Sequence, residues 1–321
     1  MPEEVLMKKI IAILTFLFFG CPWSMAPAAP FMYVPAGDGG EILVIDLHDH
    51  RIPRRIAGLA GTTTLAGQPH IPHLVAGGGN FVSIMDRRRD RIMQHIAVSG
   101  PIRHTALSPD GRQAVVVHPE DGAVSVIDMD DMEVLKTVAT GEGAAFAIFS
   151  HRGRRLYVSN EAAGTISIVD SRRWTVEGAI DTGGTPGRLV LSRDGRRLYA
   201  TDADDRRVVE VTLPLAGIRN RIAVGGVPRD IAVSGDRRWL FVTLPEKNRL
   251  LRIDLESGAR RSITLKEKPS LLALVETVDR LYVSSEAHPL LLALDPSGLD
   301  VTETIDLGSG PAQALLVIDD R

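Results

Sequence analysis

The chain has 321 residues, of which 44% are hydrophobic and only 5% aromatic, and its formal net charge is −3. This hydrophobic share is ample for a core, which Val, Ile, Leu and Ala must largely fill. The charge shows no basic excess of the kind that nucleic-acid-binding proteins carry, so no nucleic acid is expected as a partner. The only cysteine, Cys21, lies near the N-terminus, which excludes disulfides, thiolate metal sites and cysteine nucleophiles from the rest of the chain.

The N-terminal segment has the pattern of a secretory signal. Lys8 and Lys9 precede an apolar stretch at residues 10–19, and small residues lead to Ala28. The apolar stretch is too short for a membrane span but fits the hydrophobic part of a signal peptide. We therefore expect a signal peptide over residues 1–28 and export to the periplasm.

Two ways of processing this signal peptide remain open. Ala26-Pro27-Ala28 resembles a signal-peptidase site, which would release a soluble protein. Phe18-Phe19-Gly20-Cys21 resembles a weak lipobox, in which Phe18 stands where Leu or Val is usual. In the second case Cys21 would carry a lipid anchor, which is the only membrane attachment that we expect.

The remaining chain repeats one outline at intervals of about forty residues. Its clearest copy, Gly141–Gly183, contains four short apolar or alternating runs separated by turns, which predicts four strands and no helix. Seven copies follow from Phe31, and the first lacks its first strand. Residues 312–318 match the missing piece. We expect one all-β domain over residues 29–321, a seven-bladed β-propeller of four-stranded antiparallel blades closed by the C-terminal strand.

Several motifs resemble the YVTN-type β-propeller repeat, found in seven-bladed and often exported bacterial proteins. They are Ser108–Gly111 (SPDG), Val124–Asp128 (VSVID), Arg155–Asn160 (RLYVSN) and Gly225–Arg229 (GGVPR). The resemblance covers residues 31–318 and implies the fold. The family includes lactonase-like enzymes and propellers linked to heme-dependent or quinone-dependent respiration, so heme or pyrroloquinoline quinone is an open cofactor and catalysis is undecided.

Residues that recur in most blades are expected to serve the fold. An aspartate ends the third strand in six blades, and a short acceptor that closes a turn explains this pattern better than a ring of carboxylates. These residues are Asp46, Asp86, Asp128, Asp170, Asp254 and Asp295. Asp110, Asp194 and Asp236, in the turns between first and second strands, receive the same interpretation.

Polar residues that do not recur mark the candidate site on the funnel face, where the inner strands begin and the second strands end. They are Arg103, His104, His118, Asn160, Arg188, Asp202, Arg229 and Asp230. The arginines suit an anionic ligand such as a carboxylate, phosphate or heme propionate, and either histidine could ligate iron or carry a proton. Alternatively, Arg188 and Asp230 merely pair across a solvated funnel. We expect blade four, which has Ala145 and Phe146 at these levels, to contribute least to a functional site.

Other motifs are more simply structural. His70 and His73 lie in a predicted turn with no third metal ligand nearby, and Arg87–Arg91 reads as a solvated loop with at most a weak contact with anionic lipid. We expect a monomeric, non-enzymatic periplasmic scaffold that binds a protein partner or a small anionic ligand. The alternatives are a heme- or quinone-handling accessory protein and a lactonase-like hydrolase.

Overall fold

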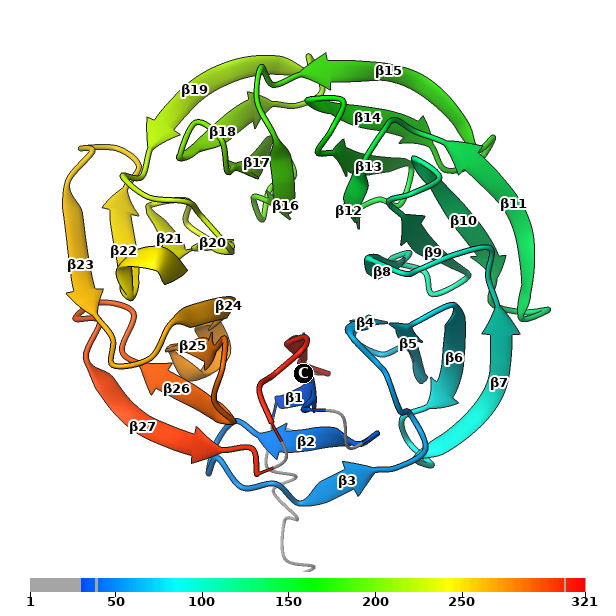
Figure 1. The fold of residues 1–321 in the computed structure, drawn as a ribbon, viewed down its shortest axis with the longest axis horizontal. Helices are drawn as coiled ribbons and strands as arrows, with labels where there is room; N and C mark the ends of the chain where they lie inside the picture. The colour runs from blue at the N-terminus through cyan, green and yellow to red at the C-terminus, as the bar shows by residue number, and fades with distance from the viewer. Residues whose placement is uncertain (1–29, 38–39, 309, 321) are drawn as a thin grey trace, which may run out of the picture.

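The computed structural model describes residues 30–37, 40–308 and 310–320; the predicted signal peptide and Cys21 lie outside them. Seven four-stranded antiparallel sheets stand around a central axis, so the predicted seven-bladed propeller is confirmed (Figure 1). Two short 3-10 helices, η1 (Pro245–Lys247) and η2 (Glu276–Val278), interrupt the described strands. No helix within the described ranges is long and apolar enough to span a membrane.

Each blade runs from an inner strand at the axis to an outer strand at the rim. The inner strands are β28 (Leu316–Ile318), β4 (Thr64–Gly67), β8 (His104–Leu107), β12 (Ala144–Phe149), β16 (Pro186–Leu191), β20 (Ile231–Val233) and β24 (Pro269–Val275). The second strands are β1 (Phe31–Pro35), β5 (His73–Gly78), β9 (Gln113–His118), β13 (Arg155–Asn160), β17 (Arg197–Asp202), β21 (Trp239–Leu244) and β25 (Arg280–Ser285).

The third and outer strands complete the blades. The third strands are β2 (Ile42–Asp46), β6 (Phe81–Asp86), β10 (Ala123–Asp128), β14 (Thr165–Asp170), β18 (Arg207–Thr212), β22 (Arg249–Asp254) and β26 (Leu290–Leu294). The outer strands are β3 (Arg54–Ile56), β7 (Arg91–Ala97), β11 (Glu133–Ala139), β15 (Thr175–Asp181), β19 (Gly217–Ala223), β23 (Arg260–Thr264) and β27 (Val301–Asp306).

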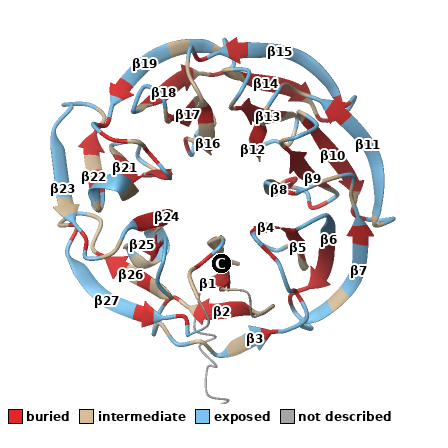
Figure 2. Ribbon diagram, viewed as in Figure 1, coloured by how far each residue is buried: buried red, intermediate tan, exposed pale blue. Residues whose placement is uncertain are grey.

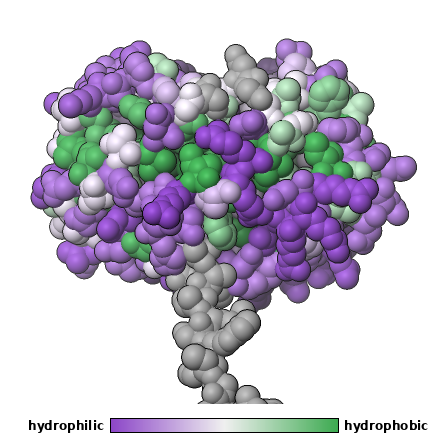
Figure 3. Space-filling view, turned by 90° about the horizontal axis from the view of Figure 1, so that it is seen from below, coloured by the Kyte–Doolittle hydropathy of each residue, from purple (hydrophilic) through white to green (hydrophobic). Residues whose placement is uncertain are grey.

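The core consists of layers between neighbouring blades. One layer packs Val115 and Val126 of blade three against Phe149, Leu156 and Trp174 of blade four. The second and third strands are buried on both faces and the outer strands are mostly exposed (Figure 2). Hydrophilic residues cover most of the rim near blade one, with hydrophobic residues visible in a band between them (Figure 3). Val, Ile, Leu and Ala thus make up most of the core, as the composition predicts, and a few aromatic side chains such as Tyr33, Tyr199, Tyr282 and Phe241 are buried among them.

The C-terminal strand closes the ring as predicted. β28 pairs antiparallel with β1, opposing Leu316 to Tyr33 and Ile318 to Phe31, and an isolated bridge joins Ala312 to Ala36. The regular strand is therefore shorter than the expected 312–318. Ile318 is 2% exposed, whereas Leu316 and its two neighbours are half-buried against the cores on either side.

A buried ion pair fixes the end of this strand to blade two. Both Nη atoms of Arg87 lie 2.7 Å from the carboxylate oxygens of Asp320, and the backbone amide of His70 donates to the same carboxylate at 2.6 Å. The Arg87 side chain is only 7% exposed. The prediction of a solvated loop is thus wrong for Arg87, because the partner lies at the far end of the sequence.

The recurring aspartates close turns, as predicted. Asp170 accepts the amide protons of Arg172 and Arg173 at 2.8 and 2.9 Å, and these bonds hold its pKa below the ordinary value. The five other strand-ending aspartates accept amide protons in the same way. Asp110 likewise accepts from the Ser108 hydroxyl at 2.6 Å and the Arg112 amide at 3.1 Å. These carboxylates therefore serve the fold, because they accept hydrogen bonds from backbone amides of their own turns.

Candidate functional site

A cavity of about 650 Å³ lies on the propeller axis at the funnel face. Its wall consists of the inner strands and the loops that lead into them, together with turns that follow the second strands. Five of the eight predicted site residues line this cavity: Arg103, His104, Arg188, Arg229 and Asp230.

Side chains at one level of the wall touch in succession across four blades. The His104 and Phe146 rings stack with centroids 3.6 Å apart and planes tilted by 30°. The Arg188 guanidinium carbon lies 4.5 Å from the Phe146 ring centre, and Arg188 Nε lies 2.9 Å from an Asp230 oxygen. Phe146 is therefore a central member of the wall, contrary to the expectation that blade four contributes least.

Asp230 holds Arg188 in place from a buried position. Its side chain is 1% exposed and accepts the amide protons of Ile231 at 2.8 Å and Leu272 at 2.9 Å. Burial raises the pKa of this carboxyl, against the opposing effect of the Arg188 charge and the two amides. The alternative prediction, that Arg188 and Asp230 pair across the funnel, is correct for this contact.

The Arg188 guanidinium is held in one orientation, and part of it remains able to bind a ligand. Its backbone amide donates to the Thr201 hydroxyl at 2.9 Å, where the inner strand breaks its register between Pro186 and Leu189. Nε faces Asp230, the guanidinium plane lies over Phe146, and the side chain is 28% exposed. Within the described ranges, neither Nη atom has an ion-pair or hydrogen-bond partner, so both can receive a ligand from the cavity.

His104 is a neutral imidazole in this setting. Burial, and then the Arg188 charge, lower its pKa well below the usual value. The Ala147 amide donates to His104 Nδ1 at 3.4 Å and the ring stacks on Phe146, so His104 is packed into the cavity wall. The iron-ligand role considered for this residue stays a prediction.

The other wall charges lie nearer the mouth. Arg103 pairs with Glu161 at 3.5 Å, and both are about half exposed. Arg229 is exposed and forms no ion pair with any residue that the structure describes. Asp204 and Glu246, also exposed, add negative charge at the mouth. The wall therefore carries charges of both signs, with Arg188 and Arg229 available on the positive side.

His118 and Asn160 do not line the cavity. Each is fully buried at the end of its second strand: His118 Nε2 contacts the Ser125 hydroxyl at 2.9 Å, and the Asn160 amide donates to Thr165 and Ser167 at 3.1 and 2.9 Å. The prediction placed them at the correct end of the blade, but their side chains enter the sheet layer. Both act as internal hydrogen-bonding groups.

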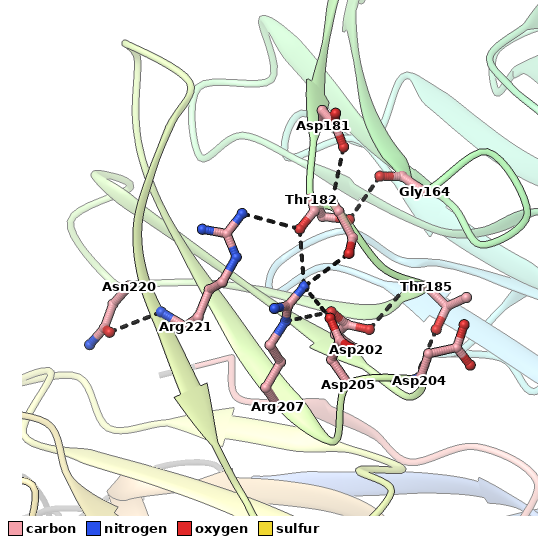
Figure 4. A network of polar contacts seen from close by, with 11 residues as sticks. Gly164, Asp181, Thr182, Thr185, Asp202, Asp204, Asp205, Arg207, Asn220 and Arg221 are labelled. Carbon is pink, nitrogen blue, oxygen red and sulfur yellow. Dashed lines mark hydrogen bonds and ion pairs between the residues drawn. The ribbon is translucent and has the colours of Figure 1, made fainter.

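Asp202 occupies the equivalent position in blade five and is the centre of an inter-blade network (Figure 4). Its carboxylate accepts from the Thr185 amide at 3.0 Å and pairs with Arg207 Nε at 2.7 Å. Arg207 in turn donates to the Thr182 and Gly183 carbonyls of the connection from blade four. Asp202 is fully buried and faces this network, away from the cavity.

A set of hydroxyls that the sequence interpretation missed links neighbouring blades. Ser159 accepts the Phe146 amide at 3.1 Å and donates to the Gly187 carbonyl of the next blade at 2.7 Å; Thr243 does the same between Asp230 and Ser270. These hydroxyls stand one residue before the end of the second strand, in YVSN and FVTL. The recurrence of Ser or Thr at this position of the repeat was the sequence signal that could have identified these hydroxyls.

The opposite face of the disc, which we call the turn face, carries the turns between first and second strands and between third and fourth strands. Neighbouring turns touch there: the His151 ring meets the Ser192 carbonyl at 2.8 Å, and Arg237 pairs with Asp194 at 3.0 Å. His70 takes part through its backbone amide, which donates to the Asp320 carboxylate. No group of three His, Cys, Asp or Glu suited to a metal occurs in the described part of the chain.

Comparison with known proteins agrees with this architecture. The model of the YNCE-like beta-propeller family matches residues 59–313. The chain belongs to this family. The YVTN-type resemblance inferred from the repeat motifs is consistent with that membership. No curated protein matches the chain in a sequence comparison.

Solved structures share the fold at low sequence identity. A functionally unknown protein from Desulfotomaculum acetoxidans is 14% identical with a TM-score of 0.78, covering 91% of this chain and 99% of that one. Kuenenia stuttgartiensis hydrazine synthase is 17% identical with a TM-score of 0.67, covering 90% and 99%. Dihydro-heme d1 dehydrogenase NirN is 13% identical with a TM-score of 0.68, covering 89% and 67%. At these identities the likeness concerns the fold alone.

Proposed function

We propose that this propeller is an exported, periplasmic binding protein that holds a small organic anion in its axial cavity. The observation that carries the proposal is the Arg188 guanidinium, which Asp230 and Phe146 fix while its two Nη atoms have no partner among the described residues. A guanidinium fixed in one orientation loses little freedom on binding and matches a carboxylate in a bidentate contact. The function is therefore recognition of a carboxylate or a similar planar anion.

Other wall residues support a ligand with its charge at one end. Arg229 supplies a second free cation beside Arg188. Leu65, Ile102 and Leu271 add apolar surface to the same cavity, and about 650 Å³ lies within the range of small-molecule sites. Because Asp204 and Glu246 add negative charge at the mouth, a compact monocarboxylate with an apolar body fits better than a polyanion.

The test uses thermal unfolding with a panel of aliphatic and aromatic monocarboxylates. A carboxylate that binds the native state raises Tm in proportion to RT ln(1 + [L]/Kd). Arg229→Gln should abolish this increase without lowering the ligand-free Tm, because Arg229 forms no ion pair that the structure describes. Arg249→Gln, an exposed position on the same face outside the cavity wall, is the matched control and should retain the response.

Two results would count against the proposal. One is a panel in which no carboxylate shifts the Tm of the unchanged protein. The other is a shift that survives both Arg229→Gln and Arg188→Gln. Visible spectra recorded with added heme or pyrroloquinoline quinone belong to the same experiment, since a tight chromophore complex would show that the cavity serves a cofactor instead.

A further inference from the structure

The turn face of blade four carries a cluster of exposed arginines that form no ion pair with the residues that the structure describes. Arg152 and Arg154 lie in the turn between β12 and β13, and Arg172 and Arg173 lie in the turn between β14 and β15. Arg196 follows in the corresponding turn of blade five. None of the five forms an ion pair within the described ranges, although seventeen ion pairs occur elsewhere in them. We call these five residues the basic surface.

Nearby carboxylates offset only part of this positive charge. Asp170 lies in the same turn as Arg172 and Arg173 and interacts with both electrostatically, and Asp194, which pairs with Arg237, does the same with Arg196. Two carboxylates against the five arginines of the basic surface still leave it positive. Asp130 and Asp131 lie on the adjacent blade three and bound the surface on that side. The chain as a whole has a net charge of −3, so this positive region is a local feature.

A protruding hydrophobic residue accompanies the basic surface. Leu215, at the tip of the turn between β18 and β19 of blade five, is 84% exposed, the largest value among the exposed large hydrophobic residues of the described chain. Turns between third and fourth strands all lie on the turn face, so Leu215 projects from the same side as the arginines. Basic residues and an exposed aliphatic side chain on one face suit an anionic lipid surface, through headgroup phosphates and the acyl boundary.

The path of the chain agrees with this orientation. β1 is a second strand and therefore starts at the turn face; the Pro30 carbonyl, just before it, accepts the amide proton of Leu47 in a turn of that face. The predicted signal and Cys21 precede Pro30 in the sequence. A membrane attachment at that end would present the turn face, rather than the funnel face, to the bilayer.

From these observations we infer that the turn face of blades four and five docks on an anionic phospholipid surface. This goes beyond the proposed anion binding and leaves the axial cavity open on the other side of the disc. The lipid phosphates pair with the basic surface, and Leu215 enters the acyl boundary. An acidic protein surface would use the arginines but would not require Leu215 to enter an apolar phase.

The test measures co-sedimentation with vesicles of phosphatidylcholine alone and of phosphatidylcholine with phosphatidylglycerol. The exported protein is used in a Cys21→Ser background, which removes the predicted lipid attachment. Binding should require phosphatidylglycerol and weaken as salt is raised to about 0.5 M. Arg152→Glu/Arg154→Glu/Arg172→Glu/Arg173→Glu should lower the partition coefficient about tenfold or more.

A matched variant separates local from overall charge. Arg206→Glu/Arg249→Glu/Lys266→Glu/Lys268→Glu reverses four exposed cations on the funnel face and should bind vesicles nearly as well as the parent. If the fourfold blade-four variant unfolds, Arg152→Gln/Arg172→Gln replaces it and should lower the partition coefficient by a smaller factor. Equal losses in the two fourfold variants would attribute binding to net charge and overturn the inference.

A thiol probe at Leu215 tests insertion directly. Because Cys21 is the only cysteine, Leu215→Cys in the Cys21→Ser background carries one site for a polarity-sensitive fluorophore. Its emission should shift to the blue with phosphatidylglycerol vesicles and stay unchanged with phosphatidylcholine alone. Absence of vesicle binding, or binding with an unshifted fluorophore, would refute docking through this face, whatever the outcome of the carboxylate test in the cavity.

Discussion

Asp320→Asn should destabilise the propeller at the point where its two ends meet. Arg87 is 7% exposed and places both Nη atoms on the Asp320 carboxylate. Removing one partner of a buried pair costs about 3 to 5 kcal/mol. Since the Asp320 side chain is 32% exposed and asparagine still accepts one hydrogen bond, we expect a loss of about 2 kcal/mol, or about 4 °C in Tm.

The pH dependence of this loss follows from the direction of the pKa shift. Burial of Asp320 tends to raise its pKa, but the hydrogen bonds from Arg87 and His70 outweigh burial and leave the pKa below its ordinary value. An unfolded chain then binds more protons near the ordinary carboxyl pKa of about 3.9, so the contribution of Asp320 is complete above about pH 4 and is lost as the pH falls through the folded pKa. The Tm values of parent and variant should converge in acid.

Calorimetry of four proteins checks this reasoning: the parent, Asp320→Asn, Arg87→Met and the double variant. The double variant should be less destabilised than the sum of the single variants, because it leaves no unpaired buried charge. Asp49→Asn, which alters an exposed pair with Arg51, is the control and should leave Tm unchanged. An unchanged Tm for Asp320→Asn, or strictly additive losses, would refute the role assigned to the pair.

Three further outcomes follow from the structure. Truncation after Gly308 should give insoluble or protease-sensitive protein, and a soluble product with the parental Tm would contradict ring closure. Gly184→Ala should lower Tm, because its Cβ would lie 2.2 Å from the Asp202 carboxylate, whereas Gly178→Ala, with no atom within 4 Å, should be neutral by the same measurement. His104→Gln should reduce the loss of stability between about pH 7 and 5. Because the His104 pKa is lowered in the folded state, the unfolded chain takes up a proton on this ring in that pH range and the folded chain does not. Urea titrations that give the same pH profile for parent and variant would contradict a neutral His104.

The repeat predicted the fold well because each blade carries its own strands and turns within about forty residues. The strand-ending aspartates show this locality: their hydrogen bonds reach only two or three residues ahead. The Arg87–Asp320 pair shows the limit, since 233 residues separate its members and no local pattern connects them.

The sequence predicted at which end of each blade the candidate site residues lie, but not the direction in which their side chains point. Alignment of blades placed His104 and His118 at the same end of blade three, and only His104 reaches the cavity. The side chain that ends a second strand is covered by the loop that enters its own blade, so it turns into the sheet. Phe146 was undervalued because a single aromatic residue has no sequence signal for stacking; its role depends on His104 and Arg188 from the adjacent blades.

The pairing of β28 with β1 also sets the order in which the molecule can be completed. Blade one has its second, third and fourth strands near the start of the chain, but its inner strand comes last. A chain that crosses a membrane from its N-terminus would therefore hold an unfinished first sheet until its final residues arrive. Because joining two ends so distant in sequence has an entropic cost, we expect the C-terminal strand to dock late in folding. During that interval the open edge of β1 is available to a chaperone, or to the β28 segment of a second copy.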